Sequence, residues 1–200
     1  CEEVRLRRAC LDRLGLNLGT LAPQSAFEYG HGTHVIRYQF FAGAVAVRVF
    51  GLNWDQGHNY HPDERRIAEA VHQLSFSPLQ LDPKFYAYGS LPFYVTRTAC
   101  SLLGKASPWF LSWDGVLATG RVLSALWGAA ACVLLALLGR RLFGERAGLL
   151  AGTFLAIAVF PVQNSHFATN DIPLATLVTA TFLLLARALA PAPEALLLDE

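Results

Sequence analysis

Methionine, charge and metal-binding cysteine patterns are what this 200-residue sequence lacks or has little of. It has no methionine, only 16% of its residues are charged, and its four cysteines form no C-x-x-C pair (Cys1, Cys10, Cys100 and Cys132). We therefore predict neither a disulfide framework nor a cysteine metal site. By contrast, 54% of the residues are hydrophobic and the mean hydropathy is +0.36. This composition predicts an integral membrane protein.

Patterns typical of several soluble functions are also missing. No glycine-rich nucleotide loop, Ser/His/Asp arrangement or continuous basic surface is visible, so a soluble nucleotide-dependent enzyme is disfavoured and no nucleic-acid partner is expected. The chain opens on cysteine and closes on Leu198-Asp199-Glu200, and we expect a piece of a longer protein. Residues 1–33 lack the apolar core of a signal peptide and are expected to be a cytoplasmic segment with a tendency to disorder, while residues 191–200 would begin a linker.

Four apolar stretches approach the roughly 20 residues that a helix needs to cross a bilayer. The first is the poorest, because it is short and contains Arg48, although an arginine near one end can snorkel to the interface. The predicted fold class is all-α, a polytopic transmembrane helical bundle within residues 34–190. Its expected spans are residues 38–53, 115–138, 147–162 and 172–190.

Arginine clusters predict the orientation of these spans. The positive-inside rule places the N-terminus and the basic turn 139–146 on the cytoplasmic side, and both anchors give the same topology. The first loop, residues 54–114, is then extracytoplasmic. In it, His61-Pro62-Asp63-Glu64 has the form of a helix start, with proline at the first helical position and acids in the first turn. A second apolar stretch, 86–103, is interpreted as an interfacial helix, with a full span as the alternative.

Asp63 and Glu64 are the first candidates for chemistry at the outer membrane face. Carboxylates near a helix N-terminus are commonly stabilised by the helix dipole and unpaired amides, so a capping interpretation stays open. Asp63 precedes Ile67 by four residues and Val71 by eight, however, and therefore shares the apolar face of the predicted helix. A carboxylate on that face, directed at a membrane-proximal cleft, suits a general base or a metal ligand.

Three further residues are candidates for phosphate or substrate binding. Arg121 lies six residues into the second predicted span, where it either snorkels to the interface or binds a lipid phosphate. Lys84 stands among aromatic residues that include Tyr88. Such a group could hold a phosphate and an amphipathic substrate, but it is equally typical of an aromatic belt with an exposed lysine.

The remaining polar candidates flank the predicted outer turn and the acid pair. Asp171 precedes the fourth span and fits an N-cap or a substrate contact. His166 is interpreted as a solvated turn residue or as a metal or substrate contact. Asp55, His58 and His61 surround the acid pair, but their spacing matches no common metal site.

Several motifs occur in an order and spacing that resembles one enzyme superfamily. They are Trp54-Asp55, His61-Pro62-Asp63-Glu64-Arg65, FYAYGSLPFY at 85–94, RVLSALWG at 121–128, RLFG at 141–144 and NDIPL at 170–174. Over residues 37–190 the chain is similar to the N-terminal part of a GT-C glycosyltransferase of the protein O-mannosyltransferase and aminoarabinose-transferase superfamily.

The resemblance implies a multi-spanning enzyme, as in a bacterial plasma membrane, that moves a sugar from a polyprenyl-phosphate carrier to a protein, lipid or glycan acceptor with inversion. The catalytic aspartate of the family maps onto Asp63, with Glu64 beside it, and its phosphate-binding arginine maps onto Arg121. Aminoarabinose-type members carry Phe-Glu-Lys-Pro where this chain has residues 88–92 (YGSLP), so those ligands are not carried over. A divalent cation held by Asp63, Glu64 and His166 stays an open expectation.

Two other function classes fit parts of the pattern. A secondary transporter would place ionisable residues at a midplane cavity, whereas the charges here sit at the ends of spans. In a non-catalytic membrane scaffold, the same residues would be helix caps or snorkelling groups.

Overall fold

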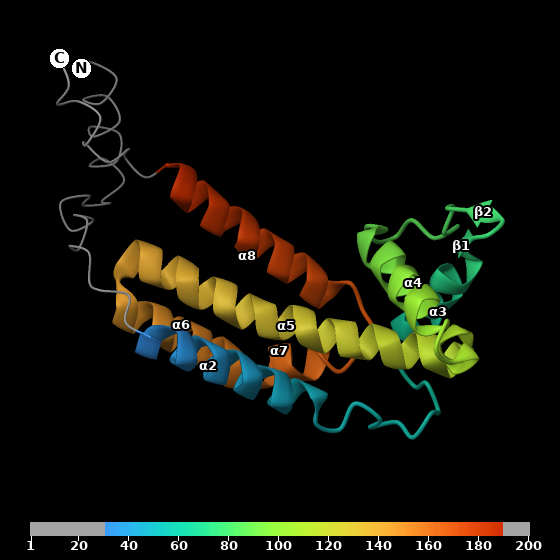
Figure 1. The fold of residues 1–200 in the computed structure, drawn as a ribbon, viewed down its shortest axis with the longest axis horizontal. Helices are drawn as coiled ribbons and strands as arrows, with labels where there is room; N and C mark the ends of the chain where they lie inside the picture. The colour runs from blue at the N-terminus through green and yellow to red at the C-terminus, as the bar shows by residue number, and fades with distance from the viewer. Residues whose placement is uncertain (1–30, 190–200) are drawn as a thin grey trace, which may run out of the picture.

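The computed structural model describes residues 31–189, which are mostly helical, as the sequence predicts (Figure 1). The predicted segment 1–33 falls outside these residues except for its last three, and the predicted linker 191–200 falls outside them entirely. The helices are α2 (His31–Val49), α3 (Pro62–Gln73), α4 (Leu91–Leu103), α5 (Trp113–Phe143), α6 (Glu145–Ile157), α7 (Val159–Asn164) and α8 (Asp171–Ala188). A 3-10 helix η2 (Pro108–Leu111) and a two-stranded hairpin, β1 (Ser75–Phe76) and β2 (Leu79–Gln80), complete the list.

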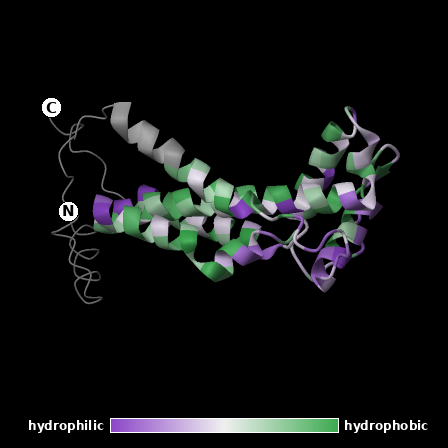
Figure 2. Cartoon of the chain, turned by 90° about the horizontal axis from the view of Figure 1, so that it is seen from below, coloured by the Kyte–Doolittle hydropathy of each residue, from purple (hydrophilic) through white to green (hydrophobic). Residues whose placement is uncertain are grey.

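Helix α5 is the axis of a bundle in which it packs against α2, α6 and α8 (Figure 1). Within the described part of the chain, α5 and α8 are the two helices long and apolar enough to cross a membrane, and Phe40–Val49 is a shorter apolar helical stretch. Hydrophobic residues run along the bundle, while hydrophilic ones gather towards its two ends (Figure 2). This distribution fits a bundle whose sides face lipid.

Glycines allow α5 and α6 to cross closely. A Cβ atom added to Gly148 would lie 2.4 Å from the carbonyl oxygen of Ala136, and one added to Gly152 would lie 2.8 Å from the Ala136 Cβ atom. Gly148 and Gly152 are four residues apart and so lie on one face of α6. Small residues at this spacing bring helix backbones together in lipid, where apolar side chains gain little by leaving their surroundings.

The stretch predicted as one span at residues 147–162 is divided in the structure. Helix α6 ends at Ile157, and α7 begins at Val159, after the extended Ala158 with ψ 127°. Pro161 explains the break, because its ring has no N–H to donate and clashes with the carbonyl four residues earlier in a continuous helix. The break leaves carbonyl groups at the end of α6 in need of donors.

Arg48 supplies those donors. Its Nη1 donates to the carbonyl oxygen of Ala156 at 3.2 Å, and its Nη2 donates to that of Leu155 at 3.0 Å. The side chain is fully buried, so the prediction that it snorkels to the interface is wrong. The guanidinium also lies at the negative end of the α6 dipole, where a positive charge is favourable.

Outside the bundle, α3, α4, the hairpin and η2 form a head around the first turns of α5 (Figure 1). Helix α3 begins at Pro62, as predicted, and the predicted apolar repeat Ile67, Val71 and Leu74 is buried against Phe93 of α4. The apolar stretch 86–103 becomes helical only from Leu91. The hairpin was not predicted, because strands of two residues carry no periodic pattern.

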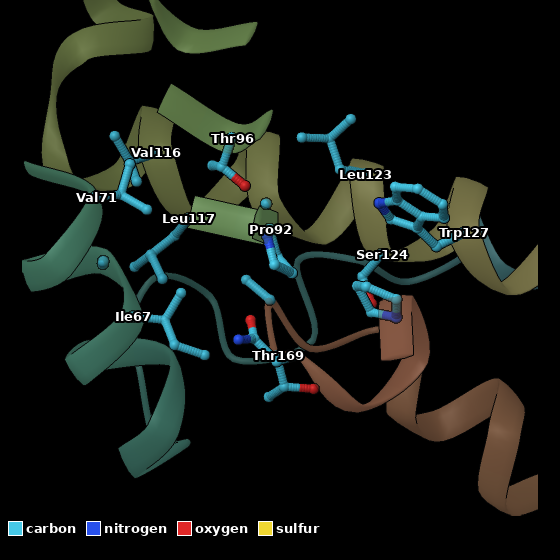
Figure 3. Close-up of a pocket in the computed structure, with 15 residues that line it drawn as sticks. Ile67, Val71, Pro92, Thr96, Val116, Leu117, Leu123, Ser124, Trp127 and Thr169 are labelled. Carbon is cyan, nitrogen blue, oxygen red and sulfur yellow. The ribbon is translucent and has the colours of Figure 1, made fainter. Parts of the chain in front are cut away.

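A small cavity lies at the junction of α3, α4, α5 and the loop before α8 (Figure 3). Its volume is about 20 Å³, room for about one water molecule. The lining is largely apolar, as with Ile67 and Trp127. Two lining hydroxyl groups, those of Ser124 and Thr169, are buried without a hydrogen-bond partner among residues 31–189. The junction between head and bundle therefore contains two polar groups, without a partner among these residues, in a largely apolar lining.

Candidate functional site

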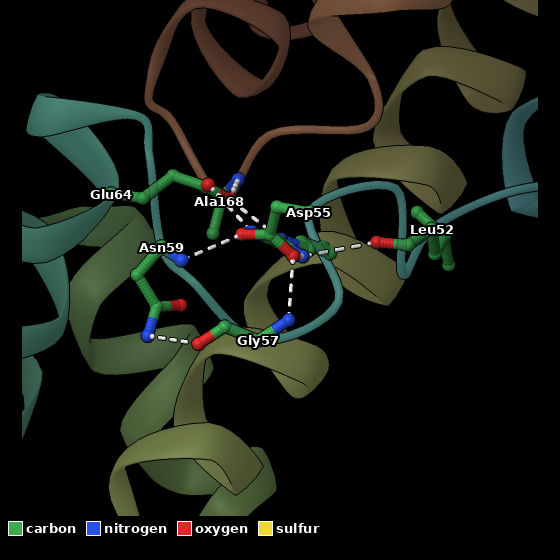
Figure 4. A network of polar contacts seen from close by, with 7 residues as sticks. Leu52, Asp55, Gly57, Asn59, Glu64 and Ala168 are labelled. Carbon is green, nitrogen blue, oxygen red and sulfur yellow. Dashed lines mark hydrogen bonds and ion pairs between the residues drawn. The ribbon is translucent and has the colours of Figure 1, made fainter.

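Two buried carboxylates, those of Asp55 and Glu64, lie close together where the bundle meets the head (Figure 4). Both are bound by the buried side chain of Arg121. Its Nε and Nη2 donate to the two carboxylate oxygens of Glu64, each at 2.8 Å. Its Nη1 and Nη2 donate to the two carboxylate oxygens of Asp55 at 2.9 and 2.7 Å, and Nη1 also donates to the carbonyl oxygen of Leu52 at 3.0 Å. All five N–H donors of the guanidinium are thus occupied, and both ion pairs have the strong bidentate geometry.

Asp55 links this charge cluster to the loop after α2. Its carboxylate also accepts hydrogen bonds from the amides of Gly57 at 3.3 Å and Asn59 at 3.0 Å. The loop needs this support, because the non-glycine residues Gln56 and Asn59 have φ values of 50° and 53°, in the left-handed region. The hydrogen bond from Arg121 is the main reason that the pKa of Asp55 is lowered to about 2.

Glu64 joins three parts of the chain. Besides its pair with Arg121, its Oε1 accepts the backbone amide of Ala168, in the loop between α7 and α8, at 2.7 Å. The side chain is fully buried, and the N-cap of α3, His61, makes no side-chain capping bond. Glu64 lies in the first turn of α3, as the capping interpretation expects, and its carboxylate is in addition a tertiary linker between α3, α5 and the loop before α8.

Asp63 differs from its neighbour. It is half-buried and makes no hydrogen bond or ion pair within residues 31–189. Of the two carboxylates that the sequence singled out, this is the one whose oxygens are free to accept a proton. The general-base role predicted for it stays a prediction, with a geometry that permits it.

The phosphate-binding role predicted for Arg121 also stays a prediction. The guanidinium has no donor left, so a phosphate could bind it only by displacing Asp55, Glu64 or the carbonyl oxygen of Leu52. In this conformation Arg121 positions α3 and the preceding loop instead. The snorkelling alternative is wrong, since the side chain is only 6% exposed and is directed at the two carboxylates.

The residues suggested as metal ligands are not brought together. Within residues 31–189, no three His, Cys, Asp or Glu side chains form a group that could hold a metal ion. Glu64 is engaged by Arg121, and the ring nitrogens of His166 lie 2.8 Å from the Val162 carbonyl oxygen and 2.7 Å from that of Phe50. His166 therefore ties α7 to the end of α2, and these residues do not fit a divalent cation.

The other predicted substrate contacts lie at the edge of the site. Asp171 is the first residue of α8 and is exposed, while Asn170 is the N-cap. The Asn170 amide donates to the carbonyl oxygen of Gly89 at 2.9 Å, which places the segment containing the exposed Tyr88 near the start of α8. Lys84 is exposed, and its ammonium makes no hydrogen bond or ion pair in the described part of the chain. None of these residues is among the hydrogen-bond partners of Arg121, which are Leu52, Asp55 and Glu64.

Aromatic side chains form a cluster beside the charge cluster. The Trp54 ring makes an edge contact with Phe167, with centroids 5.5 Å apart, and a tilted contact with Tyr60 at 6.3 Å. The Arg121 guanidinium carbon lies 5.8 Å from the Trp54 ring centroid, within cation–π range. His61, two residues before Asp63, packs on Phe167 at 4.4 Å. Sequence reasoning missed this cluster, although the aromatic and imidazole residues of segment 54–61 were its signal.

Comparison with known proteins finds a similarity in the second half of the chain. No curated protein and no solved structure matches the sequence. A family model described as "Dolichyl-phosphate-mannose-protein mannosyltransferase" matches residues 114–198. That segment includes Arg121 but not Asp55, Asp63 or Glu64. The family consists of integral membrane GT-C enzymes that use polyprenyl-phosphate sugar donors. The predicted resemblance is thus confirmed for residues 114–198, the segment that matches the model of the dolichyl-phosphate-mannose-protein mannosyltransferase family.

Proposed function

We propose that this protein moves a sugar from a polyprenyl-phosphate carrier to an acceptor hydroxyl at the outer face of a membrane, with Asp63 as the general base. The family supplies the reaction class and the donor type. The observation that carries the assignment is the contrast within the acid pair. The carboxylate of Glu64 accepts hydrogen bonds from Arg121 and from the Ala168 amide. The carboxylate of Asp63, the preceding residue, is half-buried and has no partner among the described residues.

The reaction requires one proton acceptor. Asp63 takes the proton of the acceptor hydroxyl while that oxygen attacks the anomeric carbon of the sugar. The bond from that carbon to the phosphate oxygen breaks, and its electron pair leaves with the carrier phosphate. Attack opposite the leaving phosphate inverts the anomeric carbon. Proton transfer to a positioned carboxylate contributes typically about 10²–10⁴-fold in rate.

The charge cluster has a separate task in this proposal. Arg121 holds Asp55 in the loop and Glu64 in α3, the two segments that flank Asp63 in sequence. Because Arg121 binds both Asp55 and Glu64, the loop before α3 and the start of α3 cannot move independently, and this holds Asp63 in place. Small displacements of a reacting group are costly to catalysis, so a rigid frame around the base is favourable.

The orientation follows from charge. Arg140, Arg141 and Arg146 lie around the turn between α5 and α6, at the opposite end of α5 from the head. Under the positive-inside rule this end is cytoplasmic, and the head with Asp63 is extracytoplasmic. The acceptor would then be a protein, lipid or glycan on the outer side.

Asp63→Asn in the full-length protein tests the proposal. We expect sugar transfer from a polyprenyl-phosphate donor to fall by at least about 100-fold. The unfolding free energy should fall by no more than about 1 kcal/mol, because Asp63 lies in the first turn of α3 and has only the helix dipole to lose. Glu69→Gln is the matched control, since Glu69 lies in the same helix and is exposed on a surface pair with Arg66. Transfer at the parental rate by Asp63→Asn would remove Asp63 from the chemistry.

A further inference from the structure

The aromatic cluster beside Asp63 leaves large ring surfaces uncovered. Trp54 is 43% exposed and Tyr60 is 64% exposed. These rings are in contact with one another, at an interplanar angle of 44°, and Tyr60 also stacks on His58 with centroids 5.4 Å apart. An exposed pair of aromatic rings in contact is a continuous apolar surface with polar edges, which is typical of a recognition site.

The position of this surface is fixed by the charge cluster. Trp54 directly precedes Asp55, whose carboxylate is held by Arg121, and the guanidinium of Arg121 also faces the Trp54 ring. Phe167, in the loop before α8, packs against the same Trp54 ring. The residue after it, Ala168, donates its backbone amide to Glu64. The rings are therefore anchored by the contacts that hold the two segments flanking Asp63.

One polar atom in the cluster has no partner. The Nδ1 atom of His61 is buried and makes no hydrogen bond within the described residues. Its ring lies against Phe167, and it is separated from Asp63 only by Pro62. Burying such an atom without a partner costs about 1–3 kcal/mol. A hydroxyl group could relieve that cost if the His61 ring turned to expose Nδ1.

We propose that Trp54 and Tyr60 form the surface on which the pyranose ring of the donor stacks, with a sugar hydroxyl group meeting His61. This inference rests on the proposed function and names its sugar subsite. A pyranose presents C–H groups on its faces and hydroxyl groups around its rim. The C–H groups match an exposed aromatic ring, and the hydroxyl groups match the polar edge of the aromatic cluster.

The test is Tyr60→Ala in the full-length protein, measured by transfer kinetics. Because the ring would bind substrate and transition state alike, we expect KM for the polyprenyl-phosphate sugar to rise about 3- to 10-fold with kcat nearly unchanged. Tyr60→Phe keeps the ring and should keep KM. Tyr86→Ala is the matched control, because Tyr86 is a comparably exposed tyrosine in the segment between β2 and α4, where its hydroxyl group bonds to Asp82 and not to a residue of this cluster. An unchanged KM for Tyr60→Ala would overturn the proposal.

A binding measurement separates this proposal from the assignment of Asp63. Titration with methyl α-D-mannopyranoside should change the tryptophan fluorescence of the parental protein and of Asp63→Asn, but not that of Trp54→Phe. If Asp63→Asn keeps transfer while the titration signal depends on Trp54, the base assignment fails and the sugar surface stands. Strong quenching of the Trp54-dependent fluorescence by brominated phospholipids would place the ring in the bilayer and overturn the surface.

Discussion

The carboxylate of Glu64 accepts the backbone amide of Ala168, which lies 104 residues later in the chain, at 2.7 Å. The same carboxylate pairs with Arg121 through both oxygens. One side chain therefore fixes the start of α3 against α5 and against the loop before α8. The first testable consequences concern this arrangement.

Removing the Arg121 cation alone should lower the free energy of unfolding more than removing all three charges of the cluster. Arg121→Leu leaves two buried carboxylates without their partner, and we expect a loss of about 3–5 kcal/mol in unfolding free energy. The triple variant Arg121→Leu, Asp55→Asn and Glu64→Gln has no buried charge there and should regain most of that stability. Thermal unfolding in detergent measures both variants, and a triple variant no more stable than the single would contradict this account.

The buried Arg48 is expected to be structural. Arg48→Met removes the donors for the Leu155 and Ala156 carbonyl oxygens, and we expect a loss of about 1–3 kcal/mol. Arg187→Met is the control, because Arg187 is exposed near the end of α8. The melting temperatures of the two variants are compared, and Arg48→Met should melt at the lower temperature. Equal melting temperatures would show that the hydrogen bonds from Arg48 to the end of α6 do not stabilise the fold.

Two glycine substitutions should act in opposite directions. Gly148→Ala places a Cβ atom 2.4 Å from the Ala136 carbonyl oxygen, so α5 and α6 must separate, at a cost of about 1–3 kcal/mol. Gly43→Ala in α2 meets nothing within 4 Å and should stabilise its helix by about 0.5–1 kcal/mol. Unfolding measurements on both variants test the contrast. A tolerated Gly148→Ala would mean that the close crossing is dispensable.

The Asp55 carboxylate should make stability depend on acidity. Its pKa is lowered in the folded protein to about 2 from a reference value of 3.8. A depressed pKa contributes stability that is present above about pH 4 and is lost as the pH falls towards 2. The shift corresponds to about 2 kcal/mol. Unfolding at pH 7 and pH 3 should therefore show a smaller difference for Asp55→Asn than for the parental protein.

Local signals in the sequence predicted part of the fold well. Pro62 and the acids after it mark the start of α3, and the spacing of Ile67 and Val71 shows which face is buried. The break between α6 and α7 was also readable from Pro161, but the apolar composition of 147–162 outweighed it. The hairpin had no comparable signal.

The site was less predictable, because its contacts join distant segments. No sequence pattern predicts that Asp55 and Glu64 pair with Arg121. An acidic residue in the first turn of a helix, such as Glu64, is already explained by its favourable interaction with the helix dipole. The burial of Arg48 depends on a helix end that lies more than 100 residues away. Such pairings come from tertiary packing, so only the candidates themselves were visible in the sequence.

The count of charges around Arg121 bears on the choice of acceptor. One guanidinium faces two carboxylates, so in their ionised forms the cluster has one negative charge in excess, and Asp63 adds another beside it. An uncharged hydroxyl group can approach this field without repulsion, whereas a phosphorylated or carboxylated group would be repelled at close range. The charge cluster and Asp63 together therefore favour uncharged acceptor groups. The carrier phosphate is expected to leave on the side away from Asp55 and Glu64.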